Sequence, residues 1–486
     1  ELQDDATLTA LSQALSAIRP RVLASGALPA TPHAHIPRAT YRLQFRKDFG
    51  FDAARQILPY LARLGVSHVY CSPIHRARAG STHGYDVVAH DEINPELGGP
   101  EAFARFCNAL RDNGMGQLLD MVPNHMGVLG GDNAWWSDVL ENGPSSLYAQ
   151  HFDIDWHPLH PELQGKVLLP VLGNHYGDVL MSGELQLCFV PDSGSFALQY
   201  FDHHLPVAPE TYPILLQSAQ ARIQDPDLAA SLASVAAAFG HLPGRDTQDD
   251  ITRHERSRDK ELLKARLTRL VSRHADVALA IAGAVAECNT ETHRDALHAL
   301  IEAQAYRLAF WRVAADEINY RRGFDINELA ALRIERDEVF EATQSMALDL
   351  AARGIVDGLR IDHPDGLYDP ARYFAQLQQG YASRAGLVLG APDADGRPAR
   401  PLYVVAEKIA AWHEEIPLDW ASHGTTGYRF ANAANGVLVD TDAAARFAHI
   451  WRNFTGDARE FEALAHEGKR DIMRSALASE LQVLST

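Results

Sequence analysis

A regular alternation of strand-like and helix-like segments near the start of the chain limits the fold more than any other feature. Apolar patterns predict strands at 39–45, 66–73 and 117–123, and amphipathic patterns predict helices at 51–64 and 100–114. The segments between them are short. Strand, helix, strand, helix, strand in this order is typical of a parallel β-sheet, either closed as a barrel or doubly wound.

The alternation stops after the third strand and resumes much later. Residues 128–305 contain short strand-like pieces followed by charged helices, and a structureless loop of this length is uncommon in a compact domain. We therefore expect an inserted α+β subdomain with a helical hairpin. Further strands are predicted at 356–363 and 402–406, with a candidate sixth at 424–430 and no convincing seventh or eighth.

These patterns predict an α/β fold with a large insertion after its third strand, either a (β/α)8 TIM barrel that is incomplete here or a doubly wound sheet. The predicted parts are an N-terminal helix and linker (1–37), the first part of the barrel (38–127), the inserted subdomain (128–305), the second part of the barrel (306–445) and a helical segment leading to a missing C-terminal part (446–486).

Composition narrows the range of partners. The formal net charge of −19 disfavours binding to nucleic acid and to anionic membrane surfaces, whereas neutral sugars suit it. The four cysteines show neither close pairing nor metal-ligand spacing, which favours free thiols in a reducing cytoplasm. We expect no signal peptide, because the first residues are acidic, and no membrane span, because no apolar run is long enough.

Polar residues follow four successive predicted strands. In a parallel barrel the carboxyl ends of all strands open on one face, so residues far apart in the sequence would meet in one pocket. Arg360 and Asp362 lie two residues apart and share one strand face. Taken alone, this spacing fits two interpretations. The two side chains form a structural ion pair, or Arg360 holds the Asp362 carboxylate ionised and aimed at a substrate. The other groups are residues 83–86 after the second strand, Asp120 with Asn124 and His125 at the third, and Glu407 after the fifth.

At these positions the sequence resembles the α-amylase superfamily of retaining glycosidases and transglycosidases. The resemblance lies in residues 120–125 (DMVPNH), residues 358–363 (GLRIDH) and Glu407. Within the superfamily the chain looks most like the maltooligosyl trehalose synthase family, on the strength of residues 40–45 (TYRLQF) and 314–322 (AADEINYRR).

The resemblance implies an intramolecular transferase, or isomerase, that converts the reducing-end α-1,4 bond of a maltooligosaccharide to an α,α-1,1 bond by double displacement. It implies Asp362 as the nucleophile, kept ionised and oriented by Arg360, and Glu407 as the general acid/base. No cofactor and no metal are expected. The predicted substrate-binding residues are Tyr85, His125, His363, Asn124, Asp120, Gln44 and Lys408.

The sequence departs from the superfamily in one respect that bears on activity. Superfamily members have a further Asp, usually after a His, at the end of the seventh strand, and no His-Asp pair follows Glu407. We therefore expect an amino-terminal portion with little or no activity unless a C-terminal part of the same protein completes it. The alternatives are an α-glucan hydrolase of the α-amylase type and an inactive glucan-binding fragment.

Overall fold

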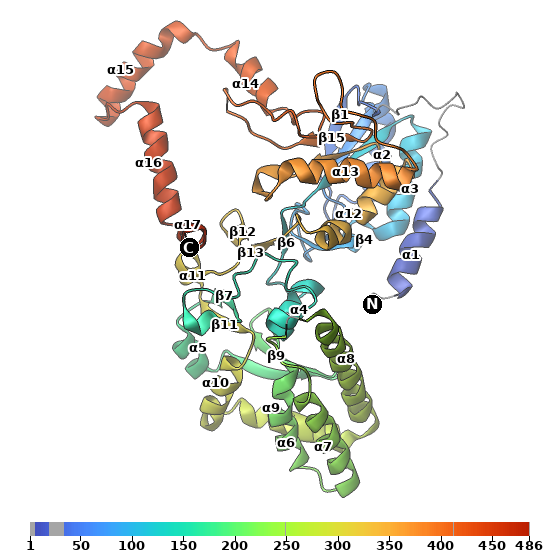
Figure 1. Ribbon diagram of the computed structural model, residues 1–486, viewed down its shortest axis with the longest axis vertical. Coiled ribbons are helices and arrows are strands. Elements are labelled where there is room, and N and C mark those ends of the chain that lie inside the picture. Colours follow the sequence, from blue (N-terminus) through green and yellow to red (C-terminus); the bar gives the residue numbers. More distant parts are fainter. Residues whose placement is uncertain (1–4, 19–33, 248, 412, 486) are drawn as a thin grey trace. The chain divides into compact units, whose positions relative to one another are not determined.

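The computed structural model describes residues 5–18, 34–247, 249–411 and 413–485 and divides into two compact units (Figure 1). Unit 1 consists of Glu1–Met126 and Leu332–Ile472, and unit 2 of Gly127–Ala331 and Met473–Thr486. Residues 306–331, which the sequence pattern assigned to the second part of the barrel, belong to unit 2.

Unit 1 alternates strands and helices. Its elements are α1 (Asp5–Ser16), β1 (Thr40–Leu43), α2 (Phe51–Arg63), β2 (His68–Cys71), β3 (His75–Ala77), β4 (Val87–Ile93), α3 (Gly99–Asp112), β5 (Gly116–Met121), α12 (Asp337–Ala352), β14 (Gly358–Ile361), a 3-10 turn η7 (Pro364–Gly366), α13 (Pro370–Ala385), β15 (Tyr403–Ala406), α14 (Tyr428–Gly436), α15 (Ala444–Thr455) and α16 (Phe461–Arg474).

The centre of unit 1 is a five-stranded sheet in the order β1-β2-β5-β14-β15, and all of its pairings are parallel. Every residue of β5 and β14 is buried, as expected for central strands covered on both faces. The helices that follow the strands present apolar faces, such as Phe103, Phe106 and Leu110 of α3. The prediction of a parallel β/α sheet with a large insertion after its third strand is confirmed.

The candidate sixth strand at 424–430 is wrong as an extended strand. Thr425 forms a single parallel bridge with Ala406, and helix α14 begins at Tyr428. Gly424 and Gly427 both have positive φ, 124° and 32°, which turns the chain out of the ladder after one bridge. Within the described residues the parallel sheet therefore has five strands, with β1 and β15 at its edges.

Unit 2 is the inserted α+β subdomain. An antiparallel sheet in the order β10-β9-β8 and a parallel pair β11-β7 pack with helices, and α8 and α9, joined at His274, form the helical hairpin. The elements are α4 (Ala134–Asn142), β7 (Val167–Leu172), α5 (Tyr176–Ser182), β8 (Gln186–Val190), β9 (Ser195–Tyr200), β10 (His203–Pro206), α6 (Tyr212–Gln220), α7 (Pro226–Gly240), α8 (Asp250–Arg273), α9 (Ala275–Cys288), α10 (Arg294–Glu302), β11 (Tyr306–Phe310), α11 (Ala314–Glu317), β12 (Arg322–Gly323), β13 (Ile326–Ala331) and α17 (Ala478–Ser485), with β6 (His125–Gly127) at the boundary of the units.

A buried ion-pair cluster joins α8 to α4. The ammonium of Lys260 lies 2.5 Å from Asp138 Oδ1 and 2.7 Å from Glu141 Oε2, and Lys264 Nζ lies 2.5 Å from Glu141 Oε1. Burial alone would raise the pKa of Glu141, but the two lysines outweigh it and lower that pKa to about 2. The cluster replaces the apolar stripe that a packed helix usually presents, which explains how so polar a helix as α8 is held in place.

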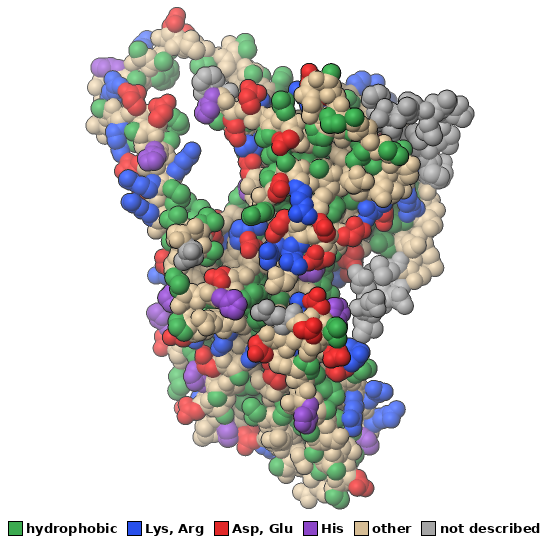
Figure 2. Space-filling model, viewed as in Figure 1, with side chains coloured by type: hydrophobic (Ala, Val, Ile, Leu, Met, Phe, Trp, Pro, Cys, Tyr) green, Lys and Arg blue, Asp and Glu red, His purple; other side chains and the backbone are tan. Residues whose placement is uncertain are grey.

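Acidic and basic side chains are intermingled on the face drawn in Figure 2. The segment from α14 to α16 exposes apolar side chains along its helices. All four cysteines are free thiols. None of the helices in the described part of the chain combines the length and the apolar character that crossing a bilayer requires. The large exposed apolar residues of the α14–α16 segment are Tyr428, Phe430, Val437, Leu438, Val439, Phe447, Ile450, Trp451, Phe454, Phe461, Ile472 and Met473.

Candidate active site

Polar side chains meet where the central strands of the parallel sheet end. Asp120 is the fifth residue of β5, and its register partner Arg360 lies on β14. Asp362 directly follows β14, and Glu407 directly follows β15. Because neighbouring parallel strands end on the same edge of the sheet, the strand register alone brings these four side chains together.

The guanidinium of Arg360 binds three carboxylates. Its Nη1 donates to Asp120 Oδ1 at 2.6 Å and to Asp362 Oδ1 at 2.7 Å, and its Nη2 lies 2.8 Å from Glu407 Oε1. Burial opposes the charge of Arg360, but Asp120 and Asp362 outweigh burial and raise its pKa above the usual value. One permanent cation therefore holds Asp362 and Glu407 beside each other, in a setting where charge-assisted bonds are strong.

Asp120, on the neighbouring strand β5, holds Arg360 in place. Its side chain is fully buried, and its Oδ2 accepts hydrogen bonds from Tyr70 Oη at 2.7 Å and Tyr85 Oη at 2.6 Å. Arg42 joins this hydrogen-bond network, because its Nη2 donates to Tyr85 Oη at 2.9 Å. Both oxygens of Asp120 are thus bonded within the protein, and Oδ1 holds Nη1 of the Arg360 guanidinium.

Asp362 is the carboxyl group whose ionisation is most affected. Burial, followed by the charges of Asp120 and Glu407, raises its pKa to about 7, although Arg360 favours the ionised form. In the empty site Arg360 therefore does not by itself hold the pKa of Asp362 at its ordinary value. The physical reason is charge balance, because one guanidinium is shared among three carboxylates in a largely buried setting.

Glu407 is held from two further sides. Its Oε2 accepts a hydrogen bond from the backbone N–H of His363 at 3.2 Å, and its Oε1 accepts one from Tyr428 Oη at 3.2 Å. His363 has the left-handed backbone angles φ 41° and ψ 57°, which are uncommon for a residue other than glycine. Such strain is concentrated at functional sites, and here it aims the N–H of His363 at Glu407.

The other residues predicted to bind substrate take different places around this centre. Asn124 and His125 are buried, and His125 Nε2 lies 3.2 Å from the backbone oxygen of Tyr85. Gln44 accepts a bond from Arg42 Nη1 at 2.5 Å. The ammonium of Lys408 lies 2.9 Å from Asp365 and 2.8 Å from Glu414, away from the Arg360 network.

Sequence reasoning missed three residues of the network, namely Arg42, Tyr70 and Tyr428. Arg42 and Tyr70 are register partners on β1 and β2, and polar side chains inside otherwise apolar strands are the signal that could have indicated them. Tyr428 was missed because residues 424–430 were assigned to a strand. Its hydroxyl reaches Glu407 from the start of helix α14.

Comparison with known proteins agrees with the geometry. Residues 53–182 match the alpha-amylase family (Alpha amylase, catalytic domain). A Mycobacterium tuberculosis protein named "Putative maltooligosyl trehalose synthase" is 32% identical over 461 residues, which cover 92% of this chain and 44% of that protein. The chain thus spans less than half the length of this curated relative.

Solved structures give the same result. The maltooligosyltrehalose synthase from Arthrobacter ramosus has a TM-score of 0.64 at 31% identity, and the match covers 92% of this chain and 44% of that chain. A hypothetical maltooligosyl trehalose synthase from Sulfolobus tokodaii has a TM-score of 0.62 at 27% identity, with 93% and 46% covered. Over most of its length the chain is therefore a relative of the maltooligosyl trehalose synthases, within the α-amylase superfamily.

Proposed function

We propose that this chain carries the nucleophile and the general acid/base of an intramolecular transglycosylation on maltooligosaccharides, as the names of its relatives suggest. The observation that carries the proposal is the Arg360 guanidinium, which binds both Asp362 and Glu407 at the ends of adjacent strands. Retaining chemistry at an anomeric carbon needs two carboxyl groups about 5 to 5.5 Å apart, and two carboxylates on one guanidinium suit that requirement.

In this proposal Asp362 attacks the anomeric carbon of the reducing-end α-1,4 bond while Glu407 protonates the leaving oxygen. The released glucose stays in the site and turns over, and its anomeric hydroxyl then attacks the glycosyl-enzyme as Glu407 takes the proton. The product ends in an α,α-1,1 unit, and Asp362 is regenerated. The first step exchanges the α-1,4 bond for the ester to Asp362, and the second exchanges that ester for the α,α-1,1 bond, so the net reaction is an isomerisation.

The remaining residues take supporting roles. Arg360 orients the nucleophile, and Asp120 with Tyr70 positions Arg360, in keeping with the burial of Asp120. We assign sugar contacts to Tyr85, His125, His363, Asn124 and Gln44, which surround the Arg360 network. Lys408 is more distant, and its contact with sugar would require release from Asp365 and Glu414.

We further propose that turnover needs additional barrel strands, which would supply the superfamily's remaining carboxylate. Both edges of the parallel sheet are open within the described residues, and the segment from α14 to α16 exposes apolar side chains that a packed barrel would cover. The free cysteines favour a reducing compartment, and we place the protein in the cytoplasm. Robust turnover by a chain verified to have 486 residues would contradict the need for completion.

Incubation with maltopentaose tests the reaction type. Transglycosylation removes reducing ends without releasing glucose, whereas hydrolysis increases reducing ends. We expect any turnover to lower the reducing-end signal and to yield a product that resists alkaline degradation. A rise in reducing ends would assign the chain to the α-glucan hydrolases, and tight glucan binding that Asp362→Asn leaves unchanged, with no turnover by either protein, would assign it to glucan-binding proteins.

A further inference from the structure

A second group of potential ligands lies at the opposite ends of the same strands. His35 stands in the segment before β1, His68 is the first residue of β2, and Asp357 directly precedes β14. Because the strands are parallel, these residues lie at their amino ends, whereas Asp362 and Glu407 lie at the carboxyl ends. Asp362 lies five positions beyond Asp357 along extended chain, roughly 16 Å at about 3.3 Å per residue. The group is therefore distinct from the candidate active site.

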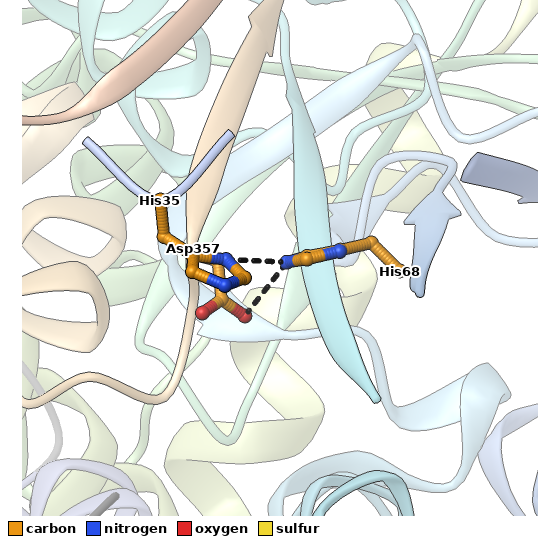
Figure 3. A group of neighbouring side chains, drawn as sticks. All are labelled: His35, His68 and Asp357. Carbon is orange, nitrogen blue, oxygen red and sulfur yellow. Dashed lines mark hydrogen bonds and ion pairs between the residues drawn. The ribbon is translucent and has the colours of Figure 1, made fainter. Parts of the chain in front are cut away.

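The three side chains converge on one point (Figure 3). His35 Nδ1 lies 3.1 Å from His68 Nε2, and His68 Nε2 lies 3.9 Å from Asp357 Oδ2. One ligand atom from each residue lies within 4.8 Å of the other two. Around a tetrahedral ion with bonds of about 2.0 to 2.1 Å, neighbouring ligand atoms stand about 3.3 Å apart, which is close to the 3.1 Å between His35 and His68 and shorter than the 3.9 Å between His68 and Asp357. Binding an ion would therefore draw His68 and Asp357 slightly together.

Hydrogen bonds set His68 in the tautomer that ligation requires. The hydroxyl of Ser67 donates to the backbone oxygen of Ala39 at 2.9 Å and accepts from the backbone N–H groups of Arg38 and Ala39 at 3.0 Å. His68 Nδ1 lies 3.0 Å from the hydroxyl oxygen of Ser67. Because the Ser67 hydroxyl proton is donated to Ala39, Nδ1 is the donor in the hydrogen bond between His68 and Ser67. The lone pair of His68 is then on Nε2, the atom that faces His35 and Asp357.

The carboxylate ligand, Asp357, is fixed as well. Asp357 Oδ2 accepts the backbone N–H of Gln117 at 2.9 Å, which orients the carboxylate toward His68. Gly116, the first residue of β5, leaves room for the side chains of His68 and Asp357. A Cβ at Gly116 would overlap Asp357 Oδ2 and the imidazole of His68, and Gly116 has no positive φ that would call for glycine on backbone grounds.

We propose that His35, His68 and Asp357 bind a divalent transition-metal ion of the Zn²⁺ class, with water as the fourth ligand. Two imidazole nitrogens and one carboxylate oxygen suit Zn²⁺, whereas Mg²⁺ and Ca²⁺ prefer sites made of oxygen alone. The ion would tie the segment before β1 to the starts of β2 and β14. Its role is to fasten the amino-terminal segment to the base of the sheet, so the inference does not depend on the proposed transglycosylation.

Metal binding by the whole chain tests this inference. The protein is stripped with a chelator, dialysed, and titrated with Zn²⁺ in competition with a chromophoric chelator of known affinity. The same is done for His35→Ala, for Asp357→Asn and for the matched control His466→Ala, which removes another exposed histidine. Asp357→Asn keeps a carbonyl oxygen for the N–H of Gln117, and His35 is exposed, so both variants retain the fold-supporting contacts described above.

We expect one tight Zn²⁺ in the parent and in His466→Ala, and at least about tenfold weaker binding in the two ligand variants. Co²⁺ added to the parent should give the visible absorption of a tetrahedral site, which His35→Ala should lose. Zn²⁺ should also raise the unfolding temperature of the parent and of His466→Ala but not that of His35→Ala. Equal Zn²⁺ affinity in all four proteins, or no tight ion in the parent, would overturn the proposal and leave the cluster as a hydrogen-bond network.

Discussion

Replacing Asp362 by Asn should stabilise the protein, and the gain should grow with pH. Burial raises the pKa of Asp362 from its ordinary 3.8 to about 7. A group with a raised folded pKa contributes stability that is fully present below about 3.8 and is lost as pH rises through about 7. Between pH 5 and pH 8 the free energy of unfolding of the parent should fall by on the order of 2 to 3 kcal/mol because of this group. The fall occurs over about two pH units, from pH 5 to the folded pKa, at roughly 1.4 kcal/mol per unit.

The assay is the free energy of unfolding by urea, measured at pH 5 and pH 8 for the parent, for Asp362→Asn and for the control Asp395→Asn. Asp395 is exposed on a loop. We expect the difference between Asp362→Asn and the parent to become more favourable to the variant by about 2 kcal/mol from pH 5 to pH 8, and the control to show no such trend. A stability difference that stays constant between pH 5 and pH 8 would refute the reasoning, because the pKa of Asp362 would then lie below that range, with attraction to Arg360 outweighing burial.

Three other substitutions test separate parts of the structure. In a form of the protein that has the additional barrel strands, Glu407→Gln should lower turnover of maltopentaose by on the order of 10² to 10⁴ but leave α-maltosyl fluoride a substrate, since fluoride leaves without protonation. Equal losses on both substrates would exclude an acid role. Tyr70→Phe removes one of two hydroxyl donors to the buried Asp120 and should cost about 1 to 2 kcal/mol of unfolding free energy; a neutral effect in urea titration would show that the bond is dispensable. Lys260→Met leaves Glu141 with one lysine fewer in a buried site and should cost about 3 to 5 kcal/mol of unfolding free energy at pH 7. This loss should shrink as pH falls toward 2 and Glu141 becomes protonated. A loss that does not depend on pH would point to lost packing instead.

The parallel sheet and the positions of the strand-end residues could be predicted because they depend on local patterns. Residues 117–123 and 356–363 read as strands from their own apolar residues, and parallel pairing then requires their carboxyl ends to meet. Asp362 and Glu407 were found in this way, each directly after a strand.

The strand assignment at 424–430 failed because backbone geometry, and not residue type, ends the pairing there. Positive φ at Gly424 and Gly427 turns the chain into α14, and a short run of residues cannot distinguish a glycine in a strand from one at a turn. The contact between Tyr428 and Glu407 depends on that turn.

The ionisation of Asp362 could not be read from sequence either. An Arg two residues away suggests a low pKa, yet the outcome depends on how many carboxylates share that guanidinium. Asp120 and Glu407 come from other strands, and only the three-dimensional structure brings them to Arg360. The same is true of His35, His68 and Asp357, which no spacing rule connects.

The identity of the residue that carries the glycosyl-enzyme tests the central claim most directly. A fluorinated maltosyl fluoride, whose glycosyl-enzyme forms faster than it breaks down, is incubated with a form of the protein that has the additional barrel strands, and the labelled peptide is sequenced by mass spectrometry. The arrangement of Arg360, Asp362 and Glu407 predicts a single label on Asp362, absent in Asp362→Asn and retained in Glu407→Gln. A label on Glu407 or on any other side chain would contradict the account.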